Sequence, residues 1–172
     1  PLPGLHTFRI SPAGIHVFAP LPPAPSSEAG NPAAPRTRLQ MGVPGLDDMM
    51  GGGLPQGYSL LVAGPSGSGK SLLAAAFLIE GARCGETGVI AAFEQRSRQS
   101  RGHALCSLID SDRVGVVDTR APDLSVDEMA MLLIDEIRRL GASRVVIDSL
   151  SGFELALAPT FRDDFRESLS RL

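Results

Sequence analysis

The sequence predicts an α/β domain with a mostly parallel, doubly wound sheet. From about residue 36 onward, short apolar runs rich in β-branched residues alternate with longer runs of helical periodicity, as in parallel sheets with crossover helices. The run RVVID, residues 144–148, lacks polar alternation, which suits a central strand covered on both faces. A glycine-rich turn near residue 67 joins one apolar run directly to an alanine- and leucine-rich run. Together these features predict the order β-loop-α-β-α-β-α-β.

The N-terminal region has a different composition from the rest. Residues 7–10 and 15–18 alternate in polarity around the turn signal Ser-Pro-Ala-Gly, which predicts a β-hairpin. Nine of the fourteen prolines lie in the first 35 residues, so residues 21–36 are interpreted as a Pro-rich linker. Because an isolated hairpin is marginal in water, residues 1–20 are expected to be the tail of a preceding domain. Residues 37–172 then form the α/β domain itself.

The elements of this domain follow from local patterns. The expected strands span residues 58–63, 88–93, 114–118 and 144–148. The expected helices span residues 69–84, 97–109 and 125–140, and the segment 160–172 reads as an amphipathic helix that reaches the chain end. In the helix 125–140, Ser125 and Glu128 form the pattern of a capping box, and Gly141 is the expected stop. No strand follows the last helix, so the sheet is expected to be incomplete at its C-terminal side.

Composition limits the partners and the compartment. With 172 residues, 43% of them hydrophobic, the chain can fill the core of one domain. Its 16 basic and 19 acidic residues leave a net charge of −3, which argues against nucleic acid and anionic membranes as partners. Cys84 and Cys106 form no C-x-x-C pair, and no apolar secretory or membrane-spanning run is present. These features predict a cytoplasmic protein that does not interact with membranes.

The glycine-rich turn has the pattern of a phosphate-binding loop, G-x-x-x-x-G-K-[ST], between a strand and a helix. Small residues let the backbone N–H groups turn inward around a phosphate chain, and the helix N-terminus adds positive dipole. Lys70 is expected to reach the β- and γ-phosphates and the Ser71 hydroxyl to bind Mg²⁺. A chance glycine turn is the alternative, which the strand and helix on either side disfavour. The expected nucleotide-binding residues are Gly64, Pro65, Ser66, Gly67, Ser68, Gly69, Lys70 and Ser71.

Two acidic residues at strand ends complete the expected site. Asp148 ends an aliphatic run, as a second magnesium partner at the carboxyl edge of a sheet would, although such aspartates also cap turns. Glu94 ends the strand after the phosphate-loop helix, where a carboxylate can orient or deprotonate the attacking nucleophile. A solvated surface charge is the alternative for Glu94. The basic residues at 96, 98 and 101 are interpreted as a solvated helix start in preference to phosphate contacts.

The lead-in to the turn is also distinctive. The run GVPGLDDMMGGGLPQG, residues 42–57, places Asp47 and Asp48 where they fit turn or helix-start roles, and three glycines then permit a sharp reversal. With this lead-in, the run from residue 41 to residue 73 resembles the entry to the ATPase domain of the RecA superfamily, in the KaiC/RadA branch. GVIAAFEQ and RVVIDSLSGFE are similar to the KaiC strand with catalytic glutamates and to its Walker B segment. The resemblance covers about residues 38–172, and residues 6–21 are similar to the closing strands of a KaiC-type domain.

The resemblance implies a RecA-like P-loop core that binds ATP and Mg²⁺ and hydrolyses ATP. Lys70 and Glu94 would be its catalytic residues, and Ser71 and Asp148 its magnesium partners. It also implies a homo-oligomeric ring, a hexamer among the options, with ATP between subunits, protein partners, and a clock or other signalling role. Some members are serine/threonine autokinases. Gln95 stands where KaiC has a second glutamate, which leaves open the balance between hydrolysis and self-phosphorylation.

Two other classes of function remain at this stage. A DNA-handling RecA/RadA recombinase shares the core, but the acidic balance and the scarcity of aromatic residues, 5% of the chain, speak against it. A nucleotide-dependent interaction module with little turnover is the other, and Gln95 is the feature that favours it.

Overall fold

The computed structural model describes residues 6–18, 37–93, 102–118 and 125–156. The strands in these ranges are β1 (Thr7–Ser11), β2 (Gly14–Phe18), β3 (Arg38–Leu39), β4 (Leu54–Pro55), β5 (Gly88–Ala92), β6 (Val114–Asp118) and β7 (Arg144–Asp148). The helices are α1 (Pro44–Met49), α2 (Lys70–Arg83), α3 (His103–Asp110), α4 (Val126–Leu140) and α5 (Leu150–Ala156).

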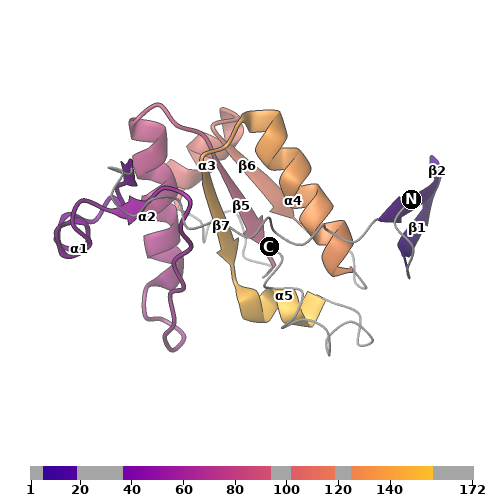
Figure 1. The fold of residues 1–172 in the computed structure, drawn as a ribbon, viewed down its shortest axis with the longest axis horizontal. Helices are drawn as coiled ribbons and strands as arrows, with labels where there is room; N and C mark the ends of the chain where they lie inside the picture. Colours follow the sequence, from indigo (N-terminus) through magenta and orange to yellow (C-terminus); the bar gives the residue numbers. More distant parts are fainter. Residues whose placement is uncertain (1–5, 19–36, 94–101, 119–124, 157–172) are drawn as a thin grey trace, which may run out of the picture.

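A three-stranded parallel sheet forms the centre of the domain, in the order β6-β5-β7 (Figure 1). Gly88 at the start of β5 is paired with Val114 and Arg144, and Ala92 at its end is paired with Asp118 and Asp148. The carboxyl ends of all three strands therefore lie along one edge. This arrangement confirms the predicted α/β class and three of the four predicted strands.

Helices cover both faces of the sheet. The lack of polar alternation in residues 144–148 predicted a sheet covered in this way. On one face, Val89 of β5 packs in a buried cluster with Met129 of α4. On the other face, Ile90 packs with Leu78 of α2 and Leu105 of α3. The central strand is β5, however, and not the RVVID strand: within the described residues β7 pairs only with β5.

The strand predicted at residues 58–63 is not found. Within the described part of the chain this segment joins no strand ladder, and Tyr58, Leu60, Leu61 and Val62 are 41% to 74% exposed. A β-branched, apolar run becomes a strand only when a neighbour supplies hydrogen bonds and burial, and no described strand lies in register with it. The short strand β4, which precedes it, pairs antiparallel with β3.

Each of the three predicted helices has a counterpart. The prediction for residues 69–84 matches α2. Helix α3 begins at His103, because Gly102 has φ 78° and ψ 144°, which is not a helical conformation; residues 97–101 of that prediction lie outside the described residues. At α4, Ser125 Oγ accepts a hydrogen bond from the Glu128 N–H at 3.1 Å, and Gly141 ends the helix at φ 60°. The short helices α1 and α5 were not predicted.

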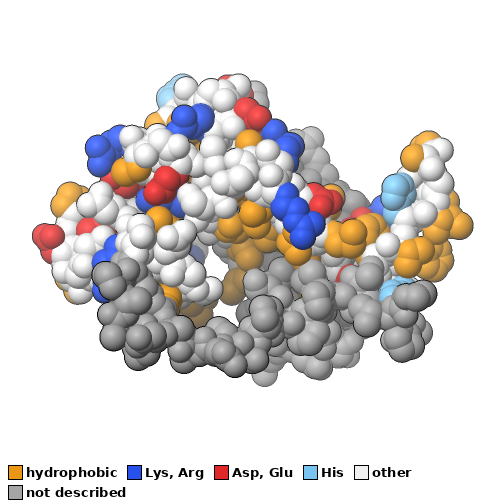
Figure 2. Space-filling model, turned by 45° about the horizontal axis from the view of Figure 1, so that its top comes forward, with side chains coloured by type: hydrophobic (Ala, Val, Ile, Leu, Met, Phe, Trp, Pro, Cys, Tyr) orange, Lys and Arg blue, Asp and Glu red, His pale blue; other side chains and the backbone are white. Residues whose placement is uncertain are grey.

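The N-terminal hairpin, β1 and β2, contacts the start of α4 through its polar face. Arg9 binds both carboxylate oxygens of Glu128, at 2.5 and 2.8 Å, so Glu128 does not complete the reciprocal half of the capping box. The opposite face of the hairpin carries four apolar side chains that are 60% to 73% exposed: Phe8, Ile10, Ile15 and Val17 (Figure 2). The interpretation of residues 1–20 as the tail of a preceding domain stays a prediction.

Several predicted features lie outside the described residues. They are the linker at 21–36, Glu94 and Gln95, the basic residues 96, 98 and 101, and the amphipathic segment 160–172. Among the helices of the described ranges, none has the length and apolar character needed to cross a bilayer.

Candidate functional site

The glycine-rich turn, residues 64–69, opens directly into α2. Gly67 and Gly69 have φ values of 81° and 89°, a left-handed conformation that side chains disfavour. Gly69 is the residue before the first turn of α2 and has no side chain with which to cap it, so the first N–H groups of the helix remain oriented toward the turn. Residues 64–68 are exposed. The turn thus offers N–H donors and a helix dipole to an anion from solvent.

Lys70 places its ammonium group inside this turn. Its Nζ donates hydrogen bonds to the carbonyl oxygens of Gly64 and Pro65, each at 2.8 Å. The positive charge therefore lies where the turn would hold a phosphate. Lys70 is also the sole lysine among the 16 basic residues of the chain, all others being arginine. A compact ammonium charge binds phosphate as a point charge, whereas a guanidinium is a planar fork.

Helix α2 and strand β7 run in opposite directions, which brings Ser71 and Asp148 to the same end of the sheet (Figure 1). At the amino end of β7, Arg144 Nη1 donates to the Phe77 carbonyl at 2.9 Å. Further along β7, Val146 packs on the cluster that contains Phe77. Ser71 lies in the first turn of α2, and Asp148 ends β7. Both predicted magnesium partners are consequently at the carboxyl edge.

Glu94 follows the last described residue of its segment. The N–H of Phe93 donates to the Asp148 carbonyl oxygen at 3.1 Å. The chain therefore reaches the carboxyl edge beside Asp148 immediately before Glu94. The position of the Glu94 side chain is outside the described residues, so its catalytic role stays a prediction.

The lead-in to the turn holds α2 through contacts that the sequence did not reveal. The buried carboxylate of Asp47 accepts a hydrogen bond from the Met41 N–H at 2.6 Å. Gly42, at φ 76°, lies so close to α2 that a Cβ there would be 2.9 Å from the Ala76 carbonyl oxygen. Arg38 Nη1 donates to the Met50 and Gly53 carbonyls at 2.8 and 2.9 Å. Asp47 thus fixes the backbone before α1. This role is more specific than the turn or helix-start role that the sequence predicted.

The residues present fit a magnesium nucleotide. A phosphate chain needs backbone N–H donors and a nearby positive charge. The exposed start of α2 and the Lys70 ammonium group offer these. Mg²⁺ is usually held by only one or two protein oxygens plus phosphate oxygens and water. Ser71 and Asp148 match this small donor set. Among the described residues there is no group of three or more His, Cys, Asp or Glu side chains that could hold a metal ion.

Comparison with known proteins decides the family. Residues 39–172 match the family model described as the KaiC ATPase. The chain belongs to the KaiC family of RecA-like P-loop ATPases.

Three relatives illustrate the similarity. The chain is 33% identical to a UPF0273 protein of Aeropyrum pernix over 140 residues, 69% of this chain and 56% of that protein. It is 35% identical to the circadian clock oscillator protein KaiC of Thermostichus vulcanus over 147 residues, 76% of this chain and 28% of that protein. It is 32% identical to the circadian clock oscillator protein KaiC of Rippkaea orientalis over 154 residues, 86% of this chain and 29% of that protein. The alignments thus span between a quarter and three fifths of these relatives.

Proposed function

We propose that this chain is the phosphate-binding part of a KaiC-like signalling ATPase that hydrolyses ATP with Mg²⁺. The observation that carries the proposal is the exposed turn 64–69, with the Lys70 ammonium inside it and Asp148 at the same edge of the sheet. This combination serves phosphoryl transfer, where catalysis is mostly positioning and charge stabilisation.

In this mechanism each residue has one task. Backbone N–H groups of the turn and of the first turn of α2 hold the phosphate chain, although Pro65 has no N–H and the Ser68 N–H is bonded to the Pro65 carbonyl oxygen at 3.3 Å. Lys70 neutralises charge on the β- and γ-phosphates. Ser71 and Asp148 would hold the magnesium ion, which would supply positive charge to the phosphate chain. Glu94 orients a water molecule and accepts its proton as the oxygen attacks the γ-phosphorus and the bond to the β-phosphate oxygen breaks. The products are ADP and inorganic phosphate.

The proposal extends to assembly and role. We infer a homo-oligomeric ring, with a hexamer as its proposed size, in which a neighbouring subunit supplies further positive charge to each ATP. Charge supplied in trans is worth several orders of magnitude in rate in other ATPases and GTPases. The relatives named circadian clock oscillator proteins support a signalling role. Serine/threonine autokinase activity is a further activity that we propose for this protein.

A nucleotide-dependent interaction module is the second candidate. Gln95 favours it, because the pair of adjacent carboxylates typical of KaiC is reduced to Glu94 alone. Such a module would bind ATP and release it unchanged.

A turnover measurement on the intact protein separates these functions. We expect Glu94→Gln to lower ATP turnover at least about 100-fold, the usual contribution of a general base, while ATP affinity changes less than about twofold. Glu136→Gln serves as the matched control, because it makes the same chemical change on α4, where Glu136 forms an ion pair with Arg139. Turnover per subunit should rise with protein concentration if the ring completes the site.

Each contrary result has a distinct meaning. Unchanged turnover in Glu94→Gln would remove Glu94 from the mechanism. Tight ATP binding without turnover in the unmodified protein would favour the interaction module. Stimulation by single-stranded DNA that is lost at high salt would favour a recombinase.

A further inference from the structure

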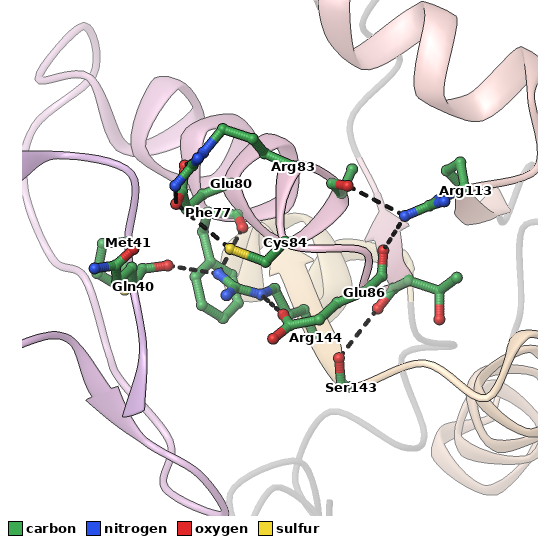
Figure 3. A network of polar contacts seen from close by, with 12 residues as sticks. Gln40, Met41, Phe77, Glu80, Arg83, Cys84, Glu86, Arg113, Ser143 and Arg144 are labelled. Atoms are coloured by element: carbon green, nitrogen blue, oxygen red, sulfur yellow. Dashed lines mark hydrogen bonds and ion pairs between the residues drawn. The ribbon is translucent and has the colours of Figure 1, made fainter. Parts of the chain in front are cut away.

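Arg144, the first residue of β7, is almost completely buried although it is charged. Its exposed fraction is 2%, and its Nε donates to the Glu86 carboxylate at 2.5 Å. Its Nη1 donates to the carbonyl oxygens of Gln40 and Phe77 at 2.5 and 2.9 Å (Figure 3). The guanidinium also lies 4.5 Å from the centroid of the Phe77 ring. One side chain therefore joins the lead-in segment, α2, the start of β5 and β7.

The surrounding backbone is shaped to admit this side chain. A Cβ on Gly81 would collide with Cδ and Nε of Arg144, so α2 can approach β7 closely only because residue 81 is glycine. Arginine suits such a position because its planar group offers five donors in fixed directions. Replacing a buried ion pair by apolar residues is often neutral or favourable for stability. The directional contacts of Arg144 are thus better explained by a need for a defined geometry than by stability.

By fixing the position of α2 relative to β7 at one end, the contacts of Arg144 also affect the opposite end of the sheet. Phe77 lies six residues after Ser71, about 9 Å along the helix axis at 1.5 Å per residue. Arg144 lies four residues before Asp148, about 13 Å along the strand at 3.3 Å per residue. Because α2 and β7 run antiparallel and each is one uninterrupted element, a shift or rotation of α2 at Phe77 moves Ser71 relative to Asp148. Misplacement by about 1 Å can cost about 100-fold in activity at a positioned site.

We propose that Arg144 is a positioning residue that sets the distance between Ser71 and Asp148 and thereby the magnesium dependence of nucleotide binding. The inference rests on the proposed function, since it assumes that these two residues share a magnesium ion. Arg144 acts through the helix and the strand, at the end of the sheet opposite the phosphate turn.

The test compares ATP affinity with and without Mg²⁺ in the intact protein. We expect Arg144→Met to reduce the gain in affinity that Mg²⁺ confers at least about tenfold, while affinity in EDTA changes less than about twofold. Arg144→Lys, which keeps the charge but has no planar fork, should fold more readily and show an intermediate loss. Urea unfolding of every variant reports stability separately.

Arg113 provides the matched control. Its Nη2 donates to the Ala82 and Glu86 carbonyls, both at 3.1 Å, so it contacts the same end of α2 but precedes β6. Arg113→Met should lower the urea midpoint and leave the magnesium effect unchanged. Equal magnesium effects in Arg144→Met, Arg144→Lys and Arg113→Met would overturn the proposal. Unmodified protein that binds no ATP under either condition would instead overturn the proposed function, before any variant is compared.

Discussion

The two ends of the α2–β7 pair are built in opposite ways. At the carboxyl edge of the sheet, residues 64–68 form an exposed turn, and Lys70 donates to two carbonyl oxygens of that turn. At the amino end, Arg144 is 2% exposed and contacts groups from three other segments. One end leaves polar groups exposed, whereas the other satisfies them within the protein.

The difference shows how the helix and the strand can position a turn that has few internal contacts of its own. A phosphate-binding turn must keep N–H groups available, so it cannot be stabilised by filling them with internal partners. Its position must come from the helix and strand that carry it. The contact of Arg144 with the Phe77 carbonyl provides such support to α2, and the Asp47 contact with the Met41 N–H holds the segment that precedes the turn.

The largest effect should come from the ligand end. Lys70→Met is expected to weaken ATP binding about 10- to 100-fold, the value of one hydrogen-bonded charge contact. The urea midpoint should change little, because the hydrogen bonds of Lys70 within the described residues go to the exposed turn. Equilibrium binding of a fluorescent ATP analogue measures the effect. Arg83→Met, at the far end of the same helix, is the control and should retain affinity. Equal affinity losses in both variants would mean that general charge, and not the turn, binds the nucleotide.

The buried end should respond in the opposite manner, through stability. Gly81→Ala forces a methyl group against Arg144 and is expected to lower the free energy of unfolding by about 1–3 kcal/mol, as overpacking does. Urea denaturation provides the measurement. Gly45→Ala is the matched control, since a Cβ on Gly45 meets nothing within 4 Å. A Gly81→Ala protein as stable as Gly45→Ala would show that α2 and β7 are not held tightly at this end.

The ligand end was largely predictable from sequence, and the buried end was not. The turn, Lys70 and Asp148 belong to local patterns in which each residue type has a chemical reason at its position. Arg144 acts through Gln40 and Phe77, which are far from it along the chain, so no local pattern specifies its contacts. The available signals were a charged residue at the start of an apolar strand and a glycine inside α2.

The errors have a similar origin in tertiary structure. Residues 58–63 have the composition of a strand, but strand formation depends on a partner that the described sheet does not provide. Helical periodicity also did not reveal the break at Gly102, after which α3 begins. By contrast α4, whose cap, apolar face and terminal glycine are all local signals, was predicted nearly to the residue.

The smallest effect should come from a polar cluster that is exposed. Arg139 binds Asp112 and Glu136 with bonds of 2.7 to 2.9 Å, but its side chain is 47% exposed. Hydrogen bonds from Arg139 hold the pKa of Glu136 and that of Asp112 below their usual values. Because these pKa values are lowered by folding, the resulting stability is present above the unfolded-state values and is lost as the pH falls through the folded-state values.

Arg139→Gln should therefore shift the urea midpoint at pH 7 less than Gly81→Ala does, and the shift should vanish in acid below both carboxyl pKa values. It should also shrink in 1 M salt, because exposed charges are screened. NMR titration of the two carboxyl groups should show both pKa values returning toward those of free side chains. A midpoint difference that is independent of pH and salt would mean that Arg139 contributes by packing. In that case the difference in stability between the exposed contacts of Arg139 and the buried contacts of Arg144 could not be attributed to solvent exposure alone.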